Sequence, residues 1–292
     1  MPNLKEVRNR ISSVISTQQI TKAMKMVSAA KLRRAQDAIL LMRPYAAKLR
    51  EIMENISGTL DSNAGGAYAA VRPVQKVLII AVSSNRGLCG AFNANINRTI
   101  NRILRENYAA QVKDENVKVL CIGKKSSEFF SKTKHLYYGN HNDIYNDLNF
   151  ESVSAIADEI MKEFASGAFD RIELVYNQFK NAAVQIVQHE QVLPISPPKG
   201  NEKAKVNDYI FEPGKEELVL ELIPKTIRIQ LYKAILDSNA SEHGARMTAM
   251  SKATDNAGEL LRDLKLSYNK ARQAAITGEI LEIVAGAEAL NN

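Results

Sequence analysis

Hydrophobic side chains recur every three or four residues along two long stretches, one at each end of the chain. The longer stretch covers roughly residues 216–290 and would span on the order of 110 Å as a single helix. Such a heptad seam predicts a coiled coil and requires a partner helix. One frame of apolar and small side chains steps through Met247, Met250, Thr254, Ala257, Leu261, Leu264, Tyr268, Ala271 and Ala275.

The partner helix is predicted over residues 3–57, where the same spacing starts at Leu4 and resumes from Leu32. The frame persists on both sides of Pro44, which predicts a bend there and not a stop. Between the two apolar parts the side chains Ile20, Met24 and Val27 occupy another face, which we expect to meet something other than the intramolecular partner. Four successive seam positions are polar there, namely Gln18, Thr21, Lys25 and Ser28.

The middle of the chain alternates short apolar runs with helix candidates, after a linker at 58–75 that is rich in Gly, Ala and Ser. This alternation predicts a small, doubly wound, Rossmann-like α/β domain over 76–212. Strands are predicted at 76–84, 117–123, 135–139, 171–179 and 182–195, the last two as an antiparallel pair. Helices are predicted at 91–107, 126–131 and 151–165, and a polar connection with a short strand at its end over 196–214.

The predicted fold class is therefore α/β, with that domain inserted between two long helices, 1–57 and 213–292. The simplest closure of this topology is an antiparallel coiled coil. The second helix is longer than the first by about 20 residues, or about 30 Å. Its C-terminal tip should extend alone beyond the N-terminus of the first helix.

The 292-residue chain carries a net charge of +7, which suggests an acidic partner: nucleic acid, anionic lipid or an acidic protein surface. Cys89 and Cys121 form no CxxC motif and are expected to be reduced thiols. No apolar run reaches the roughly 18 residues of a membrane span. The first residues are already periodic and carry Glu6, unlike a signal or transit peptide. The chain is expected to act in the compartment where it is made.

The turn from Ser84 to Gly90 lies between a predicted strand and a predicted helix, where nucleotide-binding folds hold phosphates. Its glycines fit neither GxGxxG nor a Walker A motif. A structural turn is favoured, and nucleotide binding stays an alternative. No catalytic, cofactor-binding or metal-binding residue is predicted. No histidine has a metal-ligand neighbour at i+3 or i+4, and the sequence contains neither HExxH nor a nucleophile elbow. The four histidines are His135, His141, His189 and His243.

A basic cluster on the first helix contains Lys22, Lys25, Lys31, Arg33 and Arg34. It is typical of a solvated helix face. The apolar face beside it gives equal weight to contact with an acidic protein surface. Nucleic acid is disfavoured, because no aromatic side chains are interleaved for base stacking.

The C-terminal run ITGEILEIVAGAEA (276–289) resembles the signature of the gamma subunit of F-type ATP synthases. ATDNAGELL, LSYNKARQAAIT, the N-terminal RNRISSVISTQQITKAMKMVSAAKLRRAQ, RPYA at 43–46 and the SSNRGLCGAFN turn are also similar to that family. The central sheet matches by pattern only. The signature positions are Ile276, Thr277, Glu279, Glu282, Gly286 and Ala287.

The resemblance implies a central shaft inside a hexamer of alternating alpha and beta subunits. The globular domain would sit at the foot, with the epsilon subunit, on the membrane-embedded ring of c subunits. Ion flow would turn ring and shaft, and the asymmetric shaft would take each catalytic site in turn through different affinities. Catalysis belongs to beta, so a non-catalytic subunit without cofactor is expected. The chain would touch the membrane only by way of the c-ring.

The resemblance also implies interface residues. Met24 and Lys25 match the segment that faces the acidic lever region of beta, with Lys31 and Arg33 nearby. The tip around residues 280–290 matches the part held in the apolar sleeve of the hexamer. The segment facing the beta catch loop is matched by Arg272, Gln273 and Thr277, and Glu279 and Glu282 complete the expected interface set.

Chloroplast-type members carry a regulatory cysteine pair that is missing from this central domain. Together with the missing transit peptide, this favours a bacterial protein, peripheral at the cytoplasmic face of the plasma (inner) membrane. Two rival functions stay open. A coiled-coil tether with a nucleotide-binding domain predicts saturable nucleotide binding, and a basic coiled coil that binds nucleic acid predicts steep salt dependence.

Overall fold

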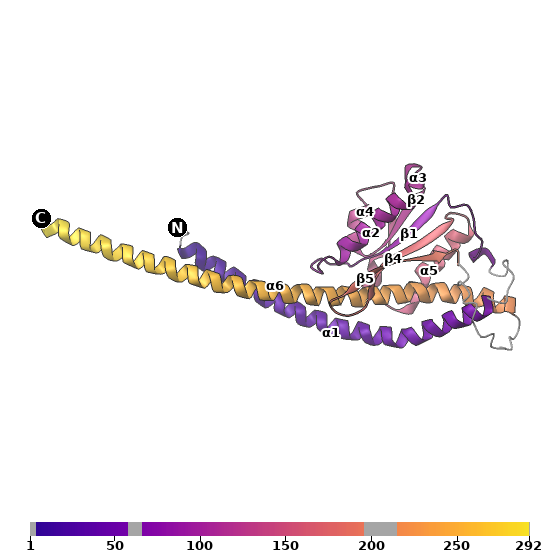
Figure 1. Ribbon diagram of the computed structural model, residues 1–292, viewed down its shortest axis with the longest axis horizontal. Coiled ribbons are helices and arrows are strands. Elements are labelled where there is room, and N and C mark those ends of the chain that lie inside the picture. The colour runs from indigo at the N-terminus through magenta and orange to yellow at the C-terminus, as the bar shows by residue number, and fades with distance from the viewer. Residues whose placement is uncertain (1–3, 58–65, 196–214, 292) are drawn as a thin grey trace. The chain divides into compact units, whose positions relative to one another are not determined.

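The computed structural model describes residues 4–57, 66–195 and 215–291 (Figure 1). The chain divides into two compact units, one of residues 1–28 with 247–292 and one of residues 29–246. Two helices pass through both units: α1 (Leu4–Ser57) and α6 (Lys215–Asn291). Both were predicted, and the helix does not stop at Pro44. Pro224 likewise lies inside α6, and the helix continues on both sides of it.

The second unit is built on a sheet whose strand order is β3-β2-β1-β4-β5. β1 pairs in parallel with β2 and β4, β2 pairs in parallel with β3, and β5 runs antiparallel to β4. Every residue of β1 is buried, which accounts for its unbroken apolar run. The strands are β1 (Val77–Val82), β2 (Val117–Ile122), β3 (Tyr137–Asn140), β4 (Arg171–Phe179) and β5 (Gln185–Leu193).

Alternate side chains of β1 face two different helical layers. Ile79 and its odd-numbered neighbours pack with α2 (Phe92–Glu106) and with Phe130 of α4 (Lys124–Phe130). Ile80 and its even-numbered neighbours pack with α5 (Phe150–Ala165) and with the first part of α6. The result is helices on both faces of the sheet, which confirms the predicted doubly wound α/β fold.

Part of α6 therefore belongs to the core of the sheet. Ile223, Ile227, Leu231 and Ile235 are all at most 2% exposed and pack in the same cluster as β1 and β4. The seam pattern alone did not predict this packing. Three short elements were also unpredicted: α3 (Ala109–Lys113) and two 3₁₀ turns, η1 (Gly66–Tyr68) and η2 (Asn142–Tyr145).

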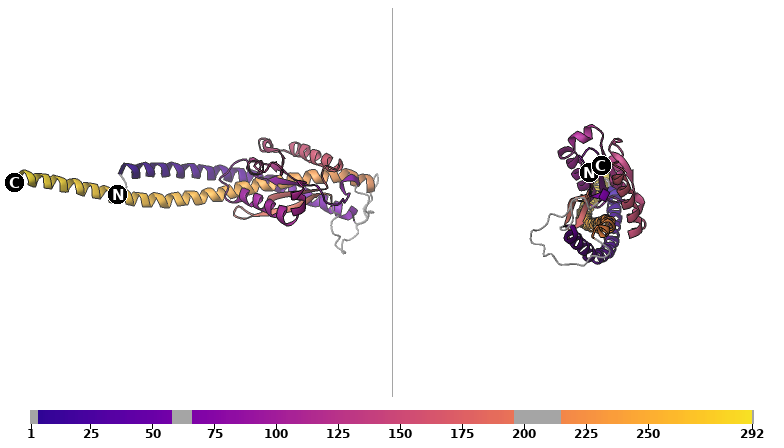
Figure 2. Two further views of the ribbon diagram at one scale, coloured as in Figure 1. Left: turned by 90° about the horizontal axis from the view of Figure 1, so that it is seen from above. Right: turned by 90° about the vertical axis from the view of Figure 1, so that its right-hand side faces the viewer.

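The first unit is an antiparallel pair formed by the start of α1 and the last part of α6. In Figure 1 and in the left-hand view of Figure 2 the helices lie side by side, and α6 continues past the N-terminal end of α1. The predicted seam is confirmed, because Val7, Thr21, Ser28 and Met250 are buried while most positions between the seam residues are exposed. None of the described helices is long and apolar enough to cross a membrane.

Some predictions concern residues outside the described ranges. These are the first part of the linker, 58–65, and the whole of the polar connection with its short strand, 196–214. The domain boundaries drawn at 57/58, 75/76 and 212/213 stay predictions.

Candidate functional site

The polar seam of the first unit is a set of contacts between the two helices. Thr254 Oγ1 on α6 donates to Thr21 Oγ1 on α1 over 2.8 Å. Gln18 Nε2 lies 3.4 Å from the carbonyl oxygen of Thr254. One turn away, Lys25 Nζ donates to Ser251 Oγ over 2.9 Å. The four predicted seam positions thus include three that bond across the pair.

The seam residue Thr21 is buried, yet the surface next to it is open. A groove of about 530 Å³ lies along the pair at this level. Ile20 and Val27 are exposed, as predicted for the displaced apolar face, whereas Met24 is only partly exposed. The residues lining the groove are Gln18, Gln19, Lys22, Lys25, Met26 and Thr254. A single surface therefore combines ammonium groups, amides and apolar side chains.

Lys31 and Arg33 belong to the second unit and are exposed on α1. Lys31 adds to the positive field around His243 and Glu242 of α6. Burial raises the pKa of Glu242, while Arg246 and Lys31 act against that rise. The pKa of His243 is lowered to about 4, mainly by burial and then by the charges of Arg246 and Lys31. Sequence reasoning gave this histidine an ordinary packing or surface role, and the structure places it in a partly buried position.

The remaining expected interface residues lie on the C-terminal tip of α6. Thr277 Oγ1 donates to the carbonyl of Gln273 in its own helix over 2.9 Å. About 26 residues separate Thr277 from Ser251, on the order of 40 Å along the helix. The structure therefore does not bring the tip together with Lys25. Arg272, Gln273, Thr277, Glu279 and Glu282 are all exposed.

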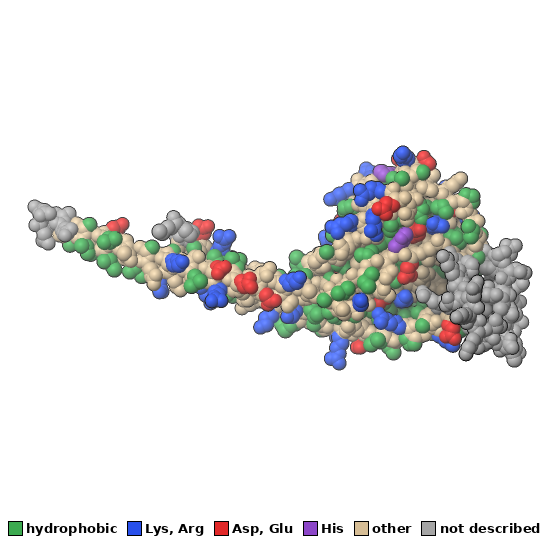
Figure 3. All heavy atoms as spheres, viewed as in Figure 1, with side chains coloured by type: hydrophobic (Ala, Val, Ile, Leu, Met, Phe, Trp, Pro, Cys, Tyr) green, Lys and Arg blue, Asp and Glu red, His purple; other side chains and the backbone are tan. Residues whose placement is uncertain are grey.

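Apolar side chains on the tip are exposed as well, so its surface is mixed (Figure 3). An exposed apolar helix surface of this kind, which no described residue covers, is typical of an interaction site. The exposed large hydrophobic residues there are Ile276, Ile280, Leu281, Ile283 and Val284.

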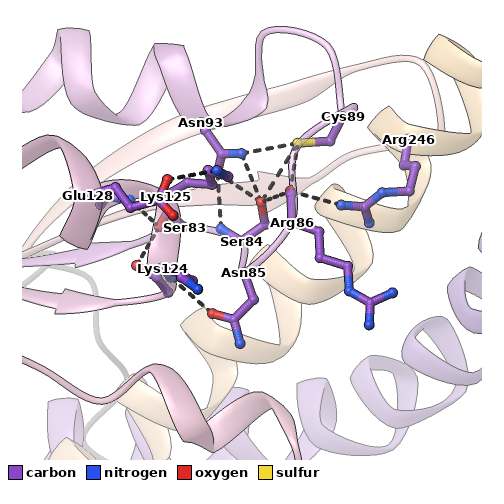
Figure 4. Close-up of polar contacts among 12 residues, drawn as sticks. Ser83, Ser84, Asn85, Arg86, Cys89, Asn93, Lys124, Lys125, Glu128 and Arg246 are labelled. Atoms are coloured by element: carbon purple, nitrogen blue, oxygen red, sulfur yellow. Dashed lines mark hydrogen bonds and ion pairs between the residues drawn. The ribbon is translucent and has the colours of Figure 1, made fainter.

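The turn after β1 uses its polar groups internally (Figure 4). Ser84 donates from its backbone N–H and its hydroxyl to Asn93 Oδ1, each over 3.0 Å. Asn85 donates to the carbonyl of Asn142 and accepts from the backbone N–H of Lys124. These bonds support the structural interpretation of the turn over nucleotide binding.

Sequence reasoning did not predict that Arg246 contacts this turn. Its Nη2 lies 3.1 Å from the carbonyl oxygen of Arg86 and 3.2 Å from that of Gly87. Its other terminal nitrogen pairs with Glu242 one helical turn earlier. The edge of the sheet where doubly wound folds bind ligands is therefore in contact with α6. An i, i+4 pair of Glu and Arg was the available signal, but on a long helix that pair is usually a surface one.

The two cysteines are free and buried. Burial raises the pKa of Cys89, and it raises the pKa of Cys121 to about 12. Both thiols therefore stay protonated near neutral pH and react slowly.

Comparisons with known proteins agree along the whole chain. The family model described as ATP synthase matches residues 3–290. The ATP synthase gamma chain of Flavobacterium johnsoniae is 62% identical over 291 residues, covering 100% of both chains. The ATP synthase gamma chain of Chlorobaculum tepidum is 47% identical over 290 residues, covering 99% of each.

Solved structures give the same architecture. The central stalk and c-ring structure of the Tetrahymena thermophila mitochondrial ATP synthase contains a chain that is 25% identical, with a TM-score of 0.58. The match covers 80% of this chain and 99% of that one. The rotor of the Euglena gracilis mitochondrial ATP synthase gives a TM-score of 0.68 at 22% identity, covering 94% and 98%. The second likeness concerns the fold alone.

Proposed function

The chain belongs to the family of ATP synthase gamma chains, and on that premise we propose how it works as the central stalk of an F-type ATP synthase. The resemblance drawn from the signature around Thr277 is thereby confirmed. The observation that carries the proposal is the 62% identity with a gamma chain over the full length. The paired helices, of which α6 continues past the end of α1, agree with it. The chain is thus a subunit of an enzyme complex.

The proposed partners are the alpha and beta subunits around the coiled coil, and the epsilon subunit and the c-ring at the globular domain. In this arrangement catalysis belongs to beta, and this chain contributes no catalytic group. Ion flow through the ring would turn the shaft, and each beta subunit would meet a different face of it. The affinity states of beta are then populations biased by the face presented to them. The complex would lie at the cytoplasmic face of a bacterial plasma membrane.

The interface residues form two groups, which would face different parts of the hexamer. Met24, Lys25, Lys31 and Arg33 would face the acidic lever region of beta, where opposite charges steer the contact. The tip residues Arg272, Gln273, Thr277, Glu279 and Glu282 would face the beta catch loop and the sleeve of the hexamer. Exposure of all but the partly buried Met24 supports this assignment.

Reconstitution tests the proposal. The full chain is mixed with alpha and beta subunits from its own source, and ATP hydrolysis is measured with and without it. We expect strong stimulation, lost when the chain is truncated after Arg246, because α6 loses its coiled-coil part. A matched truncation after Gly286 removes only the last residues and should retain most of the stimulation. Absence of both assembly and stimulation with the full chain would overturn the proposal.

A further inference from the structure

We propose that the groove on the first unit is a carboxylate-binding site to which both helices contribute, with Ser251 of α6 as the residue that positions Lys25 of α1. The inference rests on the proposed function, since the carboxylate would belong to the acidic lever region of beta. Its new content is the part played by α6. The family segments matched to the lever lie on α1 alone.

The contact between Lys25 and Ser251 orients the ammonium group. Lys25 is exposed, and its Nζ donates to Ser251 Oγ over 2.9 Å. An ammonium has three N–H donors, so two remain for a carboxylate. A free lysine side chain loses much rotamer freedom when it is captured. A lysine already held by Ser251 has lost part of that freedom beforehand, which strengthens the contact with a partner.

Contacts in the neighbouring turns set the register that brings Ser251 to Lys25. The hydroxyl contact of Thr254 with Thr21 lies on one side of Ser251, and the contact of Gln18 with the Thr254 carbonyl follows. A Cβ added to Gly258 would lie 3.1 Å from Gln18 Nε2, so glycine leaves room for the end of the Gln18 side chain there. Because the helices are antiparallel, moving from Thr21 to Lys25 on α1 corresponds to moving from Thr254 back to Ser251 on α6. This places Ser251 opposite Lys25.

The two ammonium groups in the lining of the groove favour a negatively charged partner. The groove contains two ammonium groups, Lys22 and Lys25, two amides and the hydroxyl of Thr254, and its described lining has no carboxylate. Met26 adds an apolar contact for the carbon chain of an acidic side chain. A Glu or Asp side chain on a protein segment fits this chemistry through charge-assisted hydrogen bonds.

A double-mutant cycle on the full chain in the reconstituted complex tests the inference. Stimulated ATP hydrolysis is measured for Lys25→Ala, Ser251→Ala and the double variant. We expect Ser251→Ala to lower stimulation about two- to five-fold, the value of one hydrogen bond. In the Lys25→Ala background it should change nothing. Ser251→Thr keeps a hydroxyl and should retain stimulation, and Ser267→Ala, exposed on the same helix, is the matched control.

The outcomes separate the two proposals. An equal loss from Ser251→Ala in both backgrounds would show a purely structural role, and no loss in either would show no role; both overturn the positioning of Lys25. Full stimulation by Lys25→Ala would overturn the carboxylate site as a whole. Truncation after Arg246 would still test the stalk function by itself.

Discussion

The carboxylate of Asp237 on α6 is completely buried, and neither of its oxygens accepts a well-formed hydrogen bond from the described part of the chain. The nearest ion-pair partner is Arg43 of α1, whose Nη2 lies 3.7 Å from Oδ1 and whose side chain is 48% exposed. Burial raises the pKa of Asp237, while Lys233 and Arg43 act against that rise. The ionised form is therefore disfavoured in the folded state, and this penalty fades as the pH falls through the raised pKa.

Replacing Asp237 by Asn should therefore stabilise the protein at pH 8. We expect a gain of about 1 kcal/mol in the free energy of unfolding, because a buried charge is removed and Arg43 can still be hydrated. The gain should shrink toward pH 4. Thermal unfolding at both pH values measures it. Arg43→Gln is the matched variant and should destabilise, and a loss of stability in Asp237→Asn at pH 8 would contradict the argument.

His243 gives the opposite pH dependence. Its pKa of about 4 in the folded state lies below the usual value of about 6.5. Between these values the unfolded chain binds a proton that the folded chain does not, so stability falls as the pH drops. We expect about 1–2 kcal/mol to be lost between pH 7 and pH 5 through this residue. Thermal unfolding of His243→Gln should show a weaker acid sensitivity, and an unchanged slope would exclude His243 as its source.

At the scale of elements, two glycines of α6 differ in their surroundings. A Cβ at Gly278 would meet nothing within 4 Å, whereas one at Gly258 would press on Gln18 of α1. Alanine favours a helix over glycine by up to about 1 kcal/mol. Gly278→Ala should therefore slow amide hydrogen exchange in the surrounding turns about three- to five-fold. Gly258→Ala should show a smaller gain or none, and equal gains would argue against the close approach at Gln18.

Long periodic elements could be predicted from the sequence because a heptad frame sustained over dozens of residues is typical of a long helix and of little else. β1 could be predicted because a strand covered on both faces has no polar position. The short α3 and η2 could not, since four or five residues carry no period. The sequence pattern did not predict that Ile227 packs against the sheet, for another reason. A helix face looks the same whether it meets a helix or a strand.

The candidate site was predictable in its chemistry and only partly in its geometry. The basic residues and polar seam positions stand out in the sequence, but the cross-helix partners Ser251 and Thr254 depend on the register of the pair. Register follows from packing over the whole helix. Arg246 was missed because its acceptors are backbone carbonyls, which no side-chain motif reveals.

At the scale of the whole molecule, the apolar surface of the tip should make the isolated chain associate with itself. Ile280 and Ile283 are 55% and 71% exposed. Replacing both by Gln should lower the weight-average mass of the isolated chain in sedimentation experiments. Thr17→Val, which changes an exposed side chain on α1, is the control and should not lower it. Self-association unaffected by the Gln pair would place its cause elsewhere in the molecule.

The contact of α6 with the sheet edge has a mechanical consequence. Ser241 donates to the carbonyl of Asn177 in β4, and Arg246 holds the carbonyls of the turn after β1. These hydrogen bonds, together with the buried isoleucines earlier in α6, join the helix to the sheet at several points. A torque applied to the sheet is therefore transmitted to α6 through all of these contacts together, and no single contact carries it alone. Doubly wound folds usually bind a ligand at this edge of the sheet, and here the edge holds α6 instead.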